Sequence, residues 1–186
     1  MLRNTLFTTI VAYIFAPSAV ADVVVNNWCD EKVTIVTSQG EGCDSGPDGC
    51  TRDGHDPWRL DPGSGQSIWR HPWAGDAVSI KIGKEGKKGI LQYEYSSNDG
   101  RIWWNLSDLD GGGPGLVGTP FQADNVGITP SGAGAGKGTC IKIRCAAHKT
   151  CADSYQDPAD PKTKYCPRDT GDMTVDLCMP RKSFGW

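Results

Sequence analysis

Short stretches of alternating hydrophobic and polar residues recur along the chain, and clusters of Gly, Pro, Asn and Asp separate them. Alternation with a period of two places successive side chains on opposite faces of a β-strand. No segment has the spacing of an amphipathic helix. Closely spaced strands without intervening helices predict an all-β fold, an antiparallel sandwich or barrel. The expected strands are residues 23–27, 33–37, 77–82, 91–95, 101–106, 139–144 and 173–177.

The central part of the chain predicts a β-hairpin. Within residues 91–95, Gln92 and Glu94 lie on the face opposite three large apolar or aromatic side chains. The sequence Asn98-Asp99-Gly100 is a tight-turn signal that leads into residues 101–106. We therefore expect these two strands to pair. The first two strands of the chain, joined by a polar turn at residues 30–32, predict a second hairpin in the same way.

The N-terminus has the pattern of a cleaved signal peptide over residues 1–21. Arg3 is followed by an apolar run over residues 6–16 and by the small-x-small sequence Ala19-Val20-Ala21. The apolar run is too short to span a bilayer. Residues 22–186 then form one secreted domain. The formal net charge is −3 and no basic run exceeds two residues, so neither nucleic acid nor a membrane is an expected partner.

All eight cysteines lie after the expected signal peptide. In an oxidising compartment an even number of cysteines predicts disulfides, up to four here, but their count leaves the pairing open. The chain has no Cys-x-x-Cys, and its histidines are isolated, so zinc binding is not expected. We expect no metal and no cofactor.

Two irregular stretches resemble ligand sites only superficially. Residues 40–65 include the carboxylates of Asp44, Asp48, Asp53 and Asp56 but lack the ligand spacing of a calcium-binding EF-hand loop, so a disulfide-stapled surface loop is expected. Residues 132–139 are rich in Gly and contain Lys137, as a phosphate-binding loop does. A Gly follows that Lys where Ser or Thr is required, and no helix follows, so a flexible loop is expected.

Several segments, in order along the chain, resemble those of the thaumatin-like protein family. The resemblance covers nearly all of residues 22–186 and is nearest to the small fungal secreted form, the antigenic thaumatin-like proteins. It implies a thaumatin-like antiparallel β-sandwich. The matching segments are Asn26-Asn27-Trp28-Cys29, Leu60-Asp61-Pro62-Gly63, Gln92-Tyr93-Glu94-Tyr95, Trp104-Asn105-Leu106-Ser107 with Leu109-Asp110-Gly111, and Cys151, Ser154-Tyr155, Asp160, Cys166 and Cys178-Met179-Pro180.

The resemblance also implies how the cysteines pair. It implies the disulfides Cys29–Cys178, Cys140–Cys166 and Cys145–Cys151, and it leaves Cys43–Cys50 as a local clip. Larger family members insert a cysteine-rich second domain at the position of residues 146–150, which here number too few to form one. The cleft between the two domains of those proteins would therefore lack one wall.

That cleft in larger thaumatin-like proteins is acidic and has been linked to β-1,3-glucan binding and weak glucanase activity. The positions that match its acidic residues are Glu94, Asn105 and Asp110, with Asp160 as a looser fourth. Asn105 replaces the family's Asp. Glycoside hydrolysis requires two carboxyl groups that flank the scissile bond, and Glu94 with Asp110 is the pair that remains. Loss of the carboxylate at Asn105 and a shallow cleft favour binding without turnover. As an alternative, these carboxylates only cap turns and keep the surface soluble.

The seven Trp residues offer aromatic faces for sugar rings. Trp103 and Trp104 are neighbours on an expected strand, so one should face the core and the other solvent. We expect an exposed residue such as Trp104 to contribute to binding; the alternative is that most Trp residues fill a small core. Asn105-Leu106-Ser107 is also an N-glycosylation sequon. A glycan on Asn105 would argue against a sugar-binding site there.

The sequence thus predicts a secreted, monomeric, extracellular glycoprotein, with possible association to the cell wall. It would bind cell-wall β-glucan or a host-side extracellular partner through Glu94, Asn105, Trp104, Asp110 and Asp160, without turnover. One alternative is a weak endo-β-1,3-glucanase that uses Glu94 and Asp110. Another is a surface antigen or effector that acts through protein contacts.

Overall fold

The structure is a computed structural model that describes residues 22–39, 44–46, 49–51, 56–69, 77–109, 118–155 and 157–184. The expected signal peptide, Cys43 and Asp110 lie outside these residues. The described strands are β1 Asp22–Asn27, β2 Val33–Gln39, β3 Asp44–Gly46, β4 Gly49–Thr51, β5 Trp58–Leu60, β6 Ser64–Trp69, β7 Ala77–Lys84, β8 Leu91–Asn98, β9 Arg101–Ser107, β10 Val126–Gly132, β11 Ile143–Cys145, β12 Lys164–Pro167 and β13 Thr170–Leu177. A single-turn helix, α1 Arg181–Phe184, follows them.

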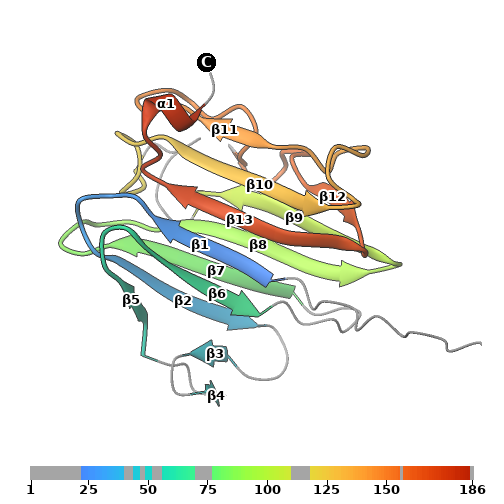
Figure 1. Cartoon of the computed structure of the whole chain (residues 1–186), viewed down its shortest axis with the longest axis horizontal. Helices are drawn as coiled ribbons and strands as arrows, with labels where there is room; N and C mark the ends of the chain where they lie inside the picture. The colour runs from blue at the N-terminus through green and yellow to red at the C-terminus, as the bar shows by residue number, and fades with distance from the viewer. Residues whose placement is uncertain are drawn as a thin grey trace, which may run out of the picture.

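Two sheets form the sandwich (Figure 1). The five-stranded sheet has the order β11-β10-β13-β1-β6, and the six-stranded sheet has the order β12-β9-β8-β7-β2-β5. A small two-stranded sheet, β3-β4, lies apart from both. Neighbouring strands are antiparallel except for β1 and β13, which are parallel. The expected all-β sandwich is confirmed, and no helix among the described residues is long and apolar enough to cross a membrane.

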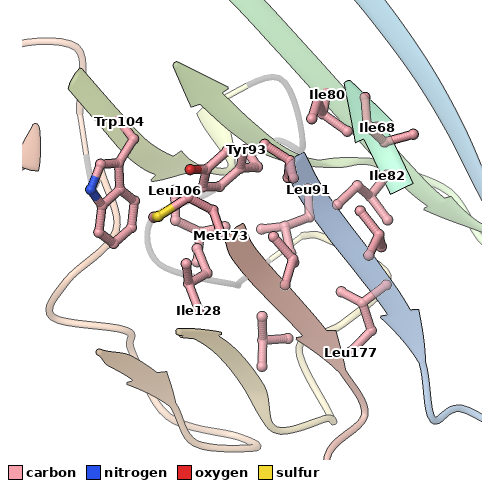
Figure 2. Close-up of a cluster of buried hydrophobic side chains, with 14 of the residues drawn as sticks. Ile68, Ile80, Ile82, Leu91, Tyr93, Trp104, Leu106, Ile128, Met173 and Leu177 are labelled. Atoms are coloured by element: carbon pink, nitrogen blue, oxygen red, sulfur yellow. The ribbon is translucent and has the colours of Figure 1, made fainter. Parts of the chain in front are cut away.

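The core lies between the sheets (Figure 2). It is built from the inward-facing residues of strands along which buried and more exposed positions alternate. Ile80 and Ile82 of β7 are completely buried, as their alternation predicts. Tyr93 and Trp104 stack with ring centroids 6.0 Å apart, and the Trp104 indole N–H donates to Cys166 Sγ at 3.3 Å. Burial of each large apolar side chain of this kind stabilises the fold by about 1.5–3 kcal/mol.

The expected hairpin between β8 and β9 is confirmed. Asp99 and Gly100 both have positive φ angles, 49° and 70°, as a two-residue type I′ turn requires. The turn sets the register of the two strands, so that Asn98 lies opposite Arg101 and Glu94 lies opposite Asn105. Turn chemistry therefore decides which side chains meet on the outer face of this sheet.

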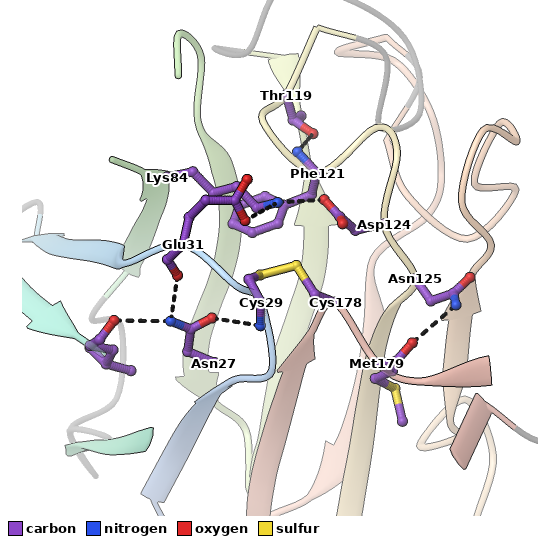
Figure 3. Close-up of a disulfide and its surroundings, with 11 residues drawn as sticks. Asn27, Cys29, Glu31, Lys84, Thr119, Phe121, Asp124, Asn125, Cys178 and Met179 are labelled. Atoms are coloured by element: carbon purple, nitrogen blue, oxygen red, sulfur yellow. Dashed lines mark hydrogen bonds and ion pairs between the residues drawn. A yellow bond between two sulfur atoms is a disulfide. The ribbon is translucent and has the colours of Figure 1, made fainter. Parts of the chain in front are cut away.

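The expected hairpin between the first two strands is wrong, because β1 and β2 belong to different sheets. The segment between them is a corner that the Asn27 side chain holds. Its Nδ2 donates to the backbone carbonyls of Glu31 and Leu60, and its Oδ1 accepts from the Cys29 backbone N–H, all at 2.9 Å (Figure 3). A polar turn that would close a hairpin instead carries the chain from one sheet to the other.

The expected strand over residues 139–144 is also shorter than predicted, because pairing begins only at Ile143. The preceding backbone forms turns, in which the Cys140 N–H donates to Lys137 O and the Ile141 N–H donates to Thr139 O. Cys140 is buried and bridged to Cys166. The alternation seen in the sequence here comes from a buried cysteine and its neighbours rather than from sheet pairing.

Three disulfides have the pairing that the family resemblance implied: Cys29–Cys178, Cys140–Cys166 and Cys145–Cys151. The fourth expected pair, Cys43–Cys50, involves residues outside the described side chains. Cys145–Cys151 closes the short loop at the position where larger family members carry their second domain. Cys29–Cys178 joins the ends of β1 and β13 across a sequence separation of 149 residues (Figure 3).

We predict that the double substitution Cys29→Ala/Cys178→Ala lowers the free energy of unfolding by about 5 kcal/mol, because a cross-link that closes so long a loop removes the most entropy from the unfolded chain. Denaturant titration followed by Trp fluorescence measures this change. The matched control, Cys145→Ala/Cys151→Ala, opens a loop with a separation of only 6 residues and should cost about 2 kcal/mol. Equal losses in the two variants would contradict the loop-entropy account.

Candidate functional site

A hollow of about 430 Å³ lies on the outer face of the six-stranded sheet. Its lining comes from β2, β7, β8 and β9 and from the segment before β12. The described residues that line it are Ser38, Gln39, Ala77, Val78, Ser79, Glu94, Tyr95, Ser96, Trp103, Trp104, Asn105 and Thr163. Side chains on this face are mostly short and polar, which leaves space above the sheet.

Strand register places a row of polar residues across the hollow. On β7, Ser79 lies between Ser38 of β2 and Glu94 of β8. On its other side, Glu94 lies opposite Asn105 of β9. Glu94 and Asn105 are both half-buried. Asn105 Oδ1 is enclosed, and it has no hydrogen-bonding partner among the residues that the structure describes. The structure therefore brings together two of the expected site residues, and the row offers hydrogen-bonding groups at the spacing of neighbouring strands.

Aromatic residues border one end of this row. The Trp103 and Tyr165 rings lie 5.4 Å apart between centroids. The Arg101 guanidinium lies 4.7 Å from the Tyr165 ring and 5.7 Å from the Trp103 ring. These cation–π contacts hold the two aromatic side chains on the outer face.

The prediction that Trp104 is exposed is wrong. Its side chain faces the core and only 1% of its surface is accessible, so its ring face is closed to a ligand. Its neighbour Trp103 is the outward residue of the pair. The alternation predicted that the two would face opposite sides, but their order along β9 depends on which face the other sheet covers.

The remaining expected residues are Asp160 and Asp110. Asp160 does not line the hollow; its Oδ2 accepts from the Asp157 N–H at 3.3 Å within a turn. Asp110 lies outside the described residues. Thr163 lines the hollow and was not predicted; its Oγ1 shares a 2.5 Å hydrogen bond with the Tyr155 hydroxyl. Among the described residues, no group of three His, Cys, Asp or Glu side chains is placed to hold a metal ion.

Residues 66–179, more than half of the chain, match the family Bys1, Blastomyces yeast-phase-specific protein. The chain belongs to the Bys1 family.

Curated relatives of this Bys1-family chain are fungal thaumatin-like proteins, which confirms the expected resemblance. The secreted thaumatin-like protein calA of Emericella nidulans is 35% identical over 105 residues, 54% of this chain and 55% of that protein. The antigenic thaumatin-like protein of Arthroderma benhamiae is 31% identical over 114 residues, 60% of this chain and 52% of that protein. The chain thus spans about half the length of the curated relatives it matches. Their names support the expected secretion.

A similar solved structure is the thaumatin-like xylanase inhibitor TLXI, with a TM-score of 0.49 and 13% sequence identity. The similarity covers 86% of this chain and all of that one. The architecture described above rests on the strands and disulfides of this chain itself.

Asp108 of the Bys1-family chain is a buried titratable residue that is not among the predicted site residues. Asp108 follows β9, and the alternation of that strand turns it inward after Leu106. Its surface is 0% accessible, and neither carboxyl oxygen has a hydrogen-bonding partner in another described residue. Burial raises the pKa of Asp108 to about 7, and the residue's own backbone amide opposes this rise in part. Extending the strand alternation by one residue would have identified it as a buried carboxyl group.

We predict that Asp108 makes the protein less stable as the pH rises. The folded protein keeps this proton up to about pH 7, whereas the unfolded chain releases it near the ordinary pKa of 3.8. The free energy of unfolding should therefore fall between about pH 4 and pH 7, by up to about 4 kcal/mol. Denaturant titrations across this pH range measure the fall.

The substitution Asp108→Asn should flatten the pH dependence, because the amide does not titrate. Asp169→Asn, which changes an exposed carboxyl group in the turn between β12 and β13, is the matched control and should keep the slope of the unsubstituted protein. An Asp108→Asn variant with that same slope would show that Asp108 ionises normally.

Proposed function

We propose that the protein binds β-glucan of the cell wall on the outer face of the six-stranded sheet, and that it does not hydrolyse it. The observation that supports this proposal is the pairing of Glu94 with Asn105 in a hollow bordered by Trp103. Sugar recognition needs polar groups that bond hydroxyls and an aromatic face that covers the apolar side of the ring. This surface offers both.

The two parts of the surface would act differently. The Glu94 carboxylate accepts hydrogen bonds from sugar hydroxyls, and the Asn105 amide and Thr163 hydroxyl add further polar groups. Trp103 supplies the apolar face. Because Arg101 and Tyr165 already hold the Trp103 ring, little side-chain freedom is lost on binding, which favours affinity.

Binding without turnover follows from the number of carboxylates. Glycoside hydrolysis uses two carboxyl groups, about 5 Å apart for retention or about 6.5–9.5 Å apart for inversion. Among the described residues that line the hollow, Glu94 is the only one with a carboxyl group. Asn105, at the position where the family resemblance implies an acid, lies opposite Glu94. The alternative of a weak endo-β-1,3-glucanase depends on Asp110, which lies outside the described residues.

The open form of the hollow also favours binding over catalysis. A general acid needs a raised pKa, which desolvation in an enclosed site provides. In the larger proteins that the chain resembles, a second domain would form the facing wall; at that position this chain has only a loop that Cys145–Cys151 closes across a separation of 6 residues. A long polysaccharide can lie across such an open sheet face, because neither of its ends has to enter a closed pocket.

We predict that the purified oxidised protein is retained on insoluble β-1,3-glucan but not on chitin or cellulose, with no release of reducing sugar. Trp103→Ala and Glu94→Gln should each weaken retention about tenfold, because each removes one main contact with the sugar. A pull-down with quantified bound and free protein measures this.

Glu85→Gln is the matched control for Glu94→Gln, since it changes an exposed carboxylate in the turn after β7 and should leave retention unchanged. Sugar release that Glu94→Gln abolishes would establish the glucanase alternative. Retention on none of the polysaccharides would favour the third reading, an antigen or effector with a host-side protein partner. Retention that survives both site substitutions would place the glucan elsewhere on the protein.

The proposal predicts that Asn105 carries no glycan, although it begins a sequon. Its Oδ1 is enclosed, and Ser107 of the same sequon is buried in β9. A glycan attached here would occupy the hollow. The intact mass of the secreted protein should therefore stay unchanged after endoglycosidase treatment, and a loss of glycan mass from the peptide that contains Asn105 would argue against the sheet-face site.

A further inference from the structure

Trp28 exposes an unusually large aromatic surface. It follows the last residue of β1, and 50% of its surface is accessible. Among the tryptophans whose side chains the structure describes, the other three, Trp58, Trp103 and Trp104, are half-buried or buried. Exposure of so large an apolar side chain forgoes the stabilisation that its burial would bring, which marks exposed aromatic surface as a candidate for ligand contact.

The exposed indole is held in one orientation. Its Nε1–H donates to Asp176 Oδ1 at 2.9 Å, and the same oxygen accepts from Asn26 Nδ2 at 2.9 Å. The Trp28 backbone N–H donates to Leu177 O at 3.1 Å, and the next residue, Cys29, is bridged to Cys178. Because both the backbone and the ring are fixed, a ligand that stacks on this ring meets a preorganised surface.

Trp28 lies on the border of a second hollow of about 570 Å³. Cys29 and Cys178, whose disulfide Figure 3 shows, line this hollow at the end of the sandwich where β1, β7 and β13 finish. Residues of the segment before β10, including Thr119, Pro120 and Gln122, form its other side. It shares no described lining residue with the hollow on the sheet face.

Charge in this second hollow is balanced. The lysines that line it are Lys84, Lys87 and Lys88, and the carboxylates are Asp30, Glu31 and Asp124. Lys84 is nearly buried, and two of these carboxylates hold it: its Nζ lies 2.7 Å from Asp124 Oδ2 and 3.4 Å from Glu31 Oε2 (Figure 3). A surface with three charges of each sign has no net preference for an anion or a cation, yet it offers many hydrogen-bond donors and acceptors.

We propose that this hollow is a second saccharide-binding site, in which the Trp28 ring stacks on a neutral sugar. The polar side chains around the hollow bond its hydroxyls. A neutral polyhydroxylated ligand fits both features, because it needs donors and acceptors together and an apolar ring face. The site is independent of the sheet-face hollow, so it stands whether or not the sheet face binds glucan. Two sites on one small domain would let it engage two segments of polysaccharide, with a gain in avidity.

The indole N–H signals of Trp28 and Trp103 in ¹⁵N-correlated NMR spectra report the two hollows separately. The full oxidised protein is titrated with laminarihexaose, cellohexaose and chitohexaose. We expect at least one of these neutral oligosaccharides to move the Trp28 signal saturably, and we expect the same shift in a Trp103→Ala variant. A Trp28 signal that stays still with all three would overturn the proposal, whatever the Trp103 signal does.

Substitution of Trp28 tests the stacking itself, with the affinity of the saccharide that moves its signal as the readout. Trp28→Ala should weaken that affinity about tenfold, and Trp28→Phe, which keeps an aromatic face, should lose less. The backbone amide signals of Thr119 and Gln122 report binding in these variants, and an otherwise unchanged spectrum shows that they fold. Unchanged affinity in Trp28→Ala would overturn the proposal. A Trp28 signal that moves only with a sulfated oligosaccharide would contradict the assignment to a neutral ligand.

Discussion

Parallel pairing of the first and last strands is the interaction on which the rest of the structure depends. β1 lies between β13 and β6, and β13 lies between β1 and β10, so these two strands hold the middle of the five-stranded sheet. Cys29–Cys178 fixes their ends together, and Asn27 turns the chain toward the other sheet. The core forms only when both sheets are present, because its side chains come from both. Both hollows therefore depend on this closure. The first lies on the outer face of the six-stranded sheet, and the second lies at the end of the sandwich beside Cys29–Cys178.

Strand alternation was sufficient to predict much of the fold. It identified β7, β8, β9 and β13, and the Asn98-Asp99-Gly100 turn identified the hairpin that places Glu94 opposite Asn105. It failed for the corner after β1, because a short polar segment joins two strands equally well within a sheet or between sheets. Only contacts distant in sequence, such as Asn27 with Leu60, separate the two cases. The cysteine pairing came from the family resemblance, because cysteine count and spacing leave it open.

The candidate site was predictable in part for the same reason. Glu94 and Asn105 meet because local turn geometry sets their register. The choice between Trp103 and Trp104 depends on which face of β9 the second sheet covers, and β9 alone does not contain that information. The exposure of Trp28 follows from the corner between β1 and β2, where the sequence pattern predicts a hairpin instead. Errors in long-range topology thus became errors in which aromatic residues face solvent.

The central position of β13 also has a consequence for biosynthesis. When the N-terminal part of the chain leaves the ribosome, β1 has only β6 as an available neighbour, and its other edge stays unpaired until β13, far later in the sequence, has been synthesised. Pairings this distant in sequence form slowly, because loop closure costs entropy before contacts compensate for it. An unpaired, apolar strand edge invites association with other chains during that interval. Secretion of this protein should therefore depend on chaperones that shield β1 until β13 has been synthesised.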